Sequence, residues 1–105
     1  MARPILVTPG CPRGVGPELA LTLPPRVRGR RVVLVTEPDV LPMSSKGPRI
    51  EARNTLGEAA SITDDAMAVW VPPGGRDPIE VRALDAATDA CLSGDADALV
   101  TGPIH

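Results

Sequence analysis

The sequence predicts an α/β fold with an open, mainly parallel, doubly wound sheet, and two features of the 105 residues support this prediction. Short apolar runs bounded by turn residues are typical of strands buried on both faces of a parallel sheet. Such runs occur at residues 4–8, 31–36, 68–71 and 97–101. Helical patterns alternate with them, as they do where helices cover both faces of a parallel sheet.

The first predicted strand, residues 4–8, leads into a loop rich in glycine and proline. Pro17 suits the first turn of a helix, because its missing N–H would have no partner there, and Glu18 complements the positive helix end. Two prolines end this predicted helix after residue 23. The second strand, residues 31–36, completes one strand, loop, helix and strand unit.

The stretch 37–67 has the least regular pattern, because several prolines interrupt it. It predicts one helical turn at 39–41 and a short strand at 49–53. The strand at 68–71 is better defined and contains Trp70, the only aromatic residue of the chain. We expect Trp70 to serve as a packing residue.

A longer amphipathic helix is predicted over residues 81–93, ended by Gly94 in a left-handed conformation. Arg82 and Asp85 lie on its predicted polar face. The predicted apolar face consists of Val81, Leu84, Ala87 or Thr88, and Cys91.

The strand at 97–101 is the last predicted element of the sequence. Because no helix follows it to cover one sheet face, we expect apolar area to remain exposed there. The expected consequence is self-association or marginal stability.

Composition excludes several classes of function. The net charge of −2 argues against a nucleic-acid or anionic-membrane binder driven by bulk charge. No apolar run approaches the roughly 20 residues that cross a bilayer, and the first residues lack a signal-peptide pattern. Cys11 and Cys91 are far apart, which favours reduced thiols and a cytoplasmic location. One domain, residues 1–105, is the natural count.

Ligands of open parallel sheets bind beyond the carboxyl ends of the strands, which selects the segments 8–18, 36–37 and 101–105. The glycines of the first loop match neither the dinucleotide fingerprint nor the Walker A loop. A phosphate cradle also fits poorly, because Pro17 removes a donor and Glu18 would repel an anion. The loop either permits close approach to a ligand or is a tight turn without one.

Two separated motifs resemble one enzyme family. The run TPGCPRGVGPE at 8–18 resembles the signature T-x-G-D-P-A-G-[IV]-G-P-E of the 4-hydroxythreonine-4-phosphate dehydrogenases of pyridoxal phosphate biosynthesis. The run GDADALVTGPI at 94–104 resembles that family's G-x-V-D-A-[IL]-V-T-A-P-I-N-K. Both occur in the family's order.

This sequence departs from those motifs at three places. Cys11 replaces the family's Asp and Arg13 replaces its Ala. His105 stands where the family has Asn followed by Lys and the larger part of its sequence. The resemblance therefore covers the amino-terminal portion of the family only.

The resemblance implies an incomplete fold like that of the isocitrate and isopropylmalate dehydrogenases, with 1–105 as the amino-terminal part of an α/β dehydrogenase domain. It implies NAD-dependent oxidation of 4-phosphooxy-L-threonine followed by decarboxylation, with a divalent metal as Lewis acid. The metal ligands would lie outside this chain. A homodimer, or a missing carboxy-terminal segment, would complete the enzyme, and this partial chain would be inactive alone.

No catalytic residue or metal ligand is assigned within the chain. The residues expected to bind cofactor or substrate are Thr8, Gly10, Gly14, Val15, Gly16, Glu18, Thr101, Pro103 and His105. Two other functions stay open: a non-catalytic binding or assembly module with the same sheet, and a phosphate acyltransferase, whose general fold is shared.

Overall fold

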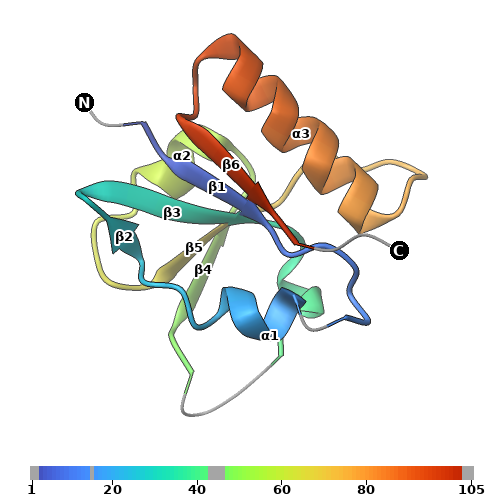
Figure 1. The fold of residues 1–105 in the computed structure, drawn as a ribbon, viewed down its shortest axis with the longest axis horizontal. Coiled ribbons are helices and arrows are strands. Elements are labelled where there is room, and N and C mark those ends of the chain that lie inside the picture. Colours follow the sequence, from blue (N-terminus) through green and yellow to red (C-terminus); the bar gives the residue numbers. More distant parts are fainter. Residues whose placement is uncertain (1–2, 15, 43–46, 103–105) are drawn as a thin grey trace.

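A computed structural model describes residues 3–14, 16–42 and 47–102 of the chain. Its centre is a mainly parallel sheet in the order β4-β5-β3-β1-β6, with a short β2 paired antiparallel to β3 (Figure 1). The strands are β1 (Ile5–Thr8), β2 (Arg26–Val27), β3 (Arg30–Val35), β4 (Ile50–Arg53), β5 (Met67–Trp70) and β6 (Ala98–Thr101). The expected α/β class and open parallel sheet are confirmed.

Helices cover both faces of this sheet. They are α1 (Gly16–Ala20), the 3-10 turn η1 (Pro38–Val40), α2 (Leu56–Ala60) and α3 (Ile79–Ser93). On one face, α2 and α3 pack over a core that includes Leu6 and Val33. On the other, α1 packs over a core that includes Val7 and Leu34. The alternation of β1 side chains between the two cores explains why that strand is apolar throughout.

The predicted strands agree with the observed ones to within one residue at each end. Two elements were missed. The hairpin β2–β3 turns through Arg28 and Gly29, both at positive φ, and a positive φ is uncommon for arginine. The short helix α2 begins with a cap in which the hydroxyl of Thr55 accepts a hydrogen bond from the Glu58 N–H, 3.2 Å away.

The first helix is shorter than predicted. It ends at Ala20, and a tight turn follows in which the N–H of Thr22 donates to the carbonyl of Leu19. The hydroxyl of Thr22 donates to the same carbonyl, 2.6 Å away. This local bond and the prolines that follow Leu23 disfavour further helical turns.

The predicted apolar face of the long helix was partly wrong. Its buried residues are Ala83, Ala87 and Ala90, whereas Val81 is 37% exposed. The face toward the sheet carries alanines, whose small side chains let the helix backbone approach the sheet closely. A prediction based on the larger apolar residues therefore placed the buried face part of a turn away from its true position. Cys91 packs against this core as expected, and Gly94 ends the helix at φ 87°.

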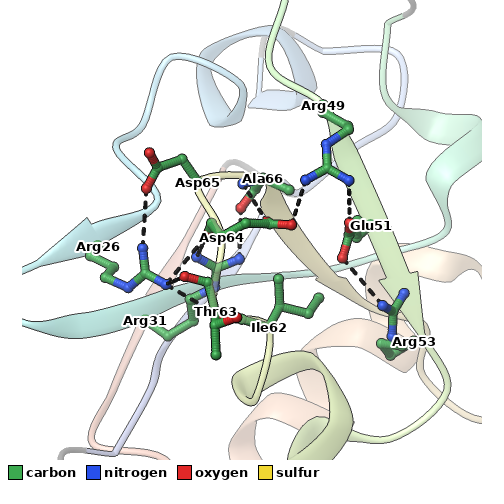
Figure 2. A network of polar contacts seen from close by, with 10 residues as sticks. All are labelled: Arg26, Arg31, Arg49, Glu51, Arg53, Ile62, Thr63, Asp64, Asp65 and Ala66. Carbon is green, nitrogen blue, oxygen red and sulfur yellow. Dashed lines mark hydrogen bonds and ion pairs between the residues drawn. The ribbon is translucent and has the colours of Figure 1, made fainter.

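Arginines fix the loop before β5 at the amino edge of the sheet (Figure 2). The buried Arg31 donates to the carbonyls of Asp64 and Ala66 at 2.8 and 2.7 Å. Arg26 donates to the carbonyl of Thr63 at 2.6 Å. Burial holds the pKa of Arg31 below its ordinary value. The loop carbonyls accept hydrogen bonds from the charged guanidinium groups of Arg26 and Arg31, and such bonds are stronger than those from neutral donors.

The carboxylate of Asp64 completes this network. It accepts the N–H of Ala66 at 2.9 Å and pairs with Arg49, which also pairs with Glu51. The Ala66 N–H, followed by the Arg49 guanidinium, lowers the pKa of Asp64. A lowered pKa in the folded state stabilises the fold above the unfolded pKa, and this contribution is lost as the pH falls through the folded pKa.

We expect Asp64→Asn to lower the melting temperature at about pH 7, and this deficit to shrink as the pH falls below about 4. The reason is that acid neutralises the wild-type carboxylate and removes the same interaction. Thermal melts over this pH range measure the effect. Asp65→Asn is the control, because the Asp65 side chain is 95% exposed. An Asp64→Asn deficit independent of pH would contradict the assignment.

Candidate functional site

The loop after β1 and the segment after β6 meet at the carboxyl edge of the sheet. Thr8 is paired in register with Thr101, and the N–H of Gly102 donates to the Thr8 carbonyl at 2.7 Å. The end of β3 lies beside β1, with Leu34 in register with Val7. The described parts of the three segments selected from the sequence thus share one edge, as expected.

This edge includes the point where the direction of the sheet order reverses. The chain leaves β1 toward β3 through α1 on one face, and reaches β6 through α3 on the other (Figure 1). Loops that diverge from adjacent strands in this way leave a crevice that commonly binds ligands in open α/β sheets. Residues 9–14 and Gly102, which follow β1 and β6, flank this point.

Two glycines allow separate backbone segments to approach each other closely here. An ideal Cβ built at Gly16 would lie 1.8 Å from the carbonyl oxygen of Pro9, and one at Gly102 would lie 2.4 Å from it. Gly10 has a φ of 82°, which also favours glycine. The sequence left two roles open for these glycines, close approach of a ligand or a tight turn. At Gly16 the structure supports the tight turn, because a side chain there would overlap the Pro9 carbonyl.

Thr8 has an unusual environment. It is 1% exposed, and its hydroxyl oxygen has no hydrogen-bond partner among the described residues. Strand alternation places it on the same sheet face as Leu6, beneath α3. A buried hydroxyl without a hydrogen-bond partner lowers the stability of the fold by roughly 1–3 kcal/mol. The end of β1 therefore contains a polar group that is unsatisfied among the described residues.

The other predicted residues are more accessible. Glu18 and Thr101 are exposed, and Gly14 is exposed in a turn where its N–H donates to the carbonyl of Cys11 at 3.0 Å. The helix that contains Glu18 has five residues and no side-chain donor in its first turn. An exposed carboxylate at this position favours hydroxyl or cationic groups over a phosphate.

Sequence reasoning selected Glu37, as part of segment 36–37, but missed its partner Arg82 at this edge. The Arg82 guanidinium donates to the Glu37 carboxylate at 2.5 Å and to the carbonyls of Asp77 and Pro73 at 3.0 and 3.3 Å. Its side chain is 17% exposed, although it was placed on the polar face. The signal available in the sequence was that Glu37 follows a strand and Arg82 begins a helix, which brings both to one edge.

Three predicted site residues, Val15, Pro103 and His105, lie outside the described residues. Among residues 3–14, 16–42 and 47–102, no group of three or more His, Cys, Asp or Glu side chains could hold a metal ion. Within the same ranges, no helix has the length and apolar character needed to span a membrane.

Comparison with known proteins identifies the relatives of this chain. No family model matches it. The 4-hydroxythreonine-4-phosphate dehydrogenase of Chromobacterium violaceum is 34% identical over 98% of the chain, and that of Xanthomonas oryzae pv. oryzae is 32% identical over all of it. The chain is a homologue of the 4-hydroxythreonine-4-phosphate dehydrogenases.

The homology extends over only part of those enzymes. The chain spans 35% and 36% of the length of the two relatives, consistent with their amino-terminal portion. The crystal structure of the 4-hydroxythreonine-4-phosphate dehydrogenase of Klebsiella pneumoniae matches 99% of this chain and 38% of its own, with a TM-score of 0.72 at 22% identity. That likeness establishes the fold.

We expect Gly16→Ala to destabilise the chain by about 1–3 kcal/mol, because the new methyl group would overlap a backbone carbonyl that has little room to move. Gly57→Ala is the matched control. It lies in α2 with nothing within 4 Å of the added Cβ, and should stabilise by about 0.5–1 kcal/mol. Urea denaturation measures both; equal effects would contradict the close approach at Pro9.

Proposed function

We propose that this chain is the amino-terminal part of an α/β dehydrogenase domain that oxidises 4-phosphooxy-L-threonine with NAD in pyridoxal 5'-phosphate biosynthesis, with decarboxylation of the oxidised product. The observation that supports this most is the 34% identity to a 4-hydroxythreonine-4-phosphate dehydrogenase over nearly the whole chain. The meeting of both resembling motifs at one sheet edge agrees with it.

In this proposal the carboxyl edge supplies one wall of the ligand crevice, formed by Thr8, Gly10, Gly14, Gly16, Glu18 and Thr101. Glu18 and Thr101 are exposed and can form hydrogen bonds to hydroxyl groups of a ribose or of the substrate. The negative charge of Glu18 disfavours a pyrophosphate beside it. NAD, when bound, accepts the hydride.

Glu37 and Arg82 support this wall. The three hydrogen bonds of Arg82 join the end of β3 to the loop between β5 and α3, so the edge is ordered before a ligand arrives. Such preorganisation lowers the conformational cost of binding.

The resemblance places the ligands of its divalent metal outside this chain, and residues 3–14, 16–42 and 47–102 contain no cluster of three or more His, Cys, Asp or Glu side chains that could hold one. We therefore assign no metal-dependent step to them. We also propose a cytoplasmic location, where free Cys11 and Cys91 stay reduced. A homodimer is the proposed assembly of the complete enzyme.

A non-catalytic binding or assembly module is the second candidate. The specific observation in its favour is Cys11, which stands where the resembling motif has an acidic residue. The two candidates differ in whether this chain can replace the corresponding part of a working enzyme.

The decisive experiment is a chimera in which this chain replaces the matching 35% of the Chromobacterium violaceum relative. We expect the chimera to reduce NAD when given 4-phosphooxy-L-threonine, and the isolated chain to show no NAD reduction. A folded but inactive chimera would favour the non-catalytic module, and turnover by the isolated chain would refute the dependence on the remaining polypeptide.

Within the chimera, we expect Gly102→Ala to lower kcat/KM by about 10²-fold, because an added Cβ would displace the Pro9 loop from the adjacent strand end. Gly57→Ala, on α2 and away from this edge, should leave kcat/KM unchanged. Initial rates of NADH formation measure both variants. Equal activities would exclude the loop from the site.

A further inference from the structure

The two outer strands of the sheet differ in chemistry. The edge strand β4 reads Ile-Glu-Ala-Arg, and its Glu51 and Arg53 are ion-paired at 3.2 Å. The opposite edge strand β6 reads Ala-Leu-Val-Thr and contains no charged residue or proline. Charges and prolines are the usual devices that keep an exposed edge from pairing with another strand. Only β4 carries such protection.

The sheet face at β6 is also uncovered on one side. Val100 is in register with Val7, which places both side chains on the face that carries α1. Val7 is 8% exposed, whereas Val100 is 56% exposed, so the cover provided by α1 does not extend to β6. The sequence-based expectation of exposed apolar area at the last strand is confirmed.

The opposite face of β6 is covered by α3. The helix α3 packs against β6 on this face, where the half-buried Leu99 joins the core. The open backbone of residues 98–101 and the exposed Val100 together form what we call the β6 surface.

We propose that the β6 surface docks the polypeptide that corresponds to the remaining two-thirds of the homologous dehydrogenases, which adds a strand to β6 and an apolar layer over Val100. This inference rests on the proposed function. The relatives extend well beyond the 35–36% of their length that this chain matches. A following segment meets β6 first, and consecutive elements are usually neighbours in space.

The composition of β6 suits contact with this additional polypeptide better than contact with solvent. In a chain of the relatives' length, β6 becomes an interior strand, for which an uncharged apolar sequence is the expected one. The protected edge β4 then remains an outer strand. This assignment explains the different composition of the two edges with a single arrangement.

The test is to co-express this chain with the remaining 65% of the Chromobacterium violaceum relative as a separate polypeptide. We expect a one-to-one complex by light scattering, with slowed hydrogen exchange at residues 98–101. Val100→Lys should weaken the complex by about tenfold or more, equivalent to about 1.4 kcal/mol. The control is Val27→Lys, because Val27 is 39% exposed on β2 and should have no effect.

Three outcomes would overturn the docking proposal. They are a dimer of this chain through the β6 surface, a complex in which Val100→Lys and Val27→Lys behave alike, and no complex with a two-thirds polypeptide that is itself folded. Introducing Val100→Lys into the active chimera and measuring exchange at 98–101 covers the case in which the separate two-thirds does not fold. A complex without NAD reduction would instead refute the dehydrogenase function and leave the docking intact.

Discussion

The close approach of three backbone segments around the carbonyl of Pro9 is the constraint on which the candidate site depends. Gly16 and Gly102 reach this carbonyl from opposite ends of the sequence, and neither position has room for a side chain. The contact sets where the first loop turns and where the segment after β6 passes. The geometry of this end of the strands therefore follows from backbone packing.

The amino and carboxyl ends of the strands differ in how their polar groups are paired. At the amino edge, Arg26 and Arg31 satisfy the carbonyls of one loop, and the charged carboxylate of Asp64 is stabilised by the N–H of Ala66 and by Arg49. At the carboxyl edge the Thr8 hydroxyl is buried without a partner among the described residues, and the Glu18 carboxylate is exposed. Glu37 and Arg82 form an ordered ion pair at this same carboxyl edge.

The homology adds a reason for the uneven cover of the sheet. Alanines let α3 pack closely on one face, while Val100 stays exposed on the other. A chain that matches about a third of its relatives' length need not bury every apolar surface by itself.

The sequence by itself determined five of the six described strands, the α/β class and the edge at which the two resembling motifs would meet. It could do so because strands buried on both faces are continuously apolar, and because parallel strands end at a common edge. Only the tertiary structure decided which face of α3 is buried, that Gly16 accommodates the Pro9 carbonyl, and that Arg82 bonds to Glu37. Each of these depends on how closely distant backbones approach, and a single sequence holds no local signal of that distance.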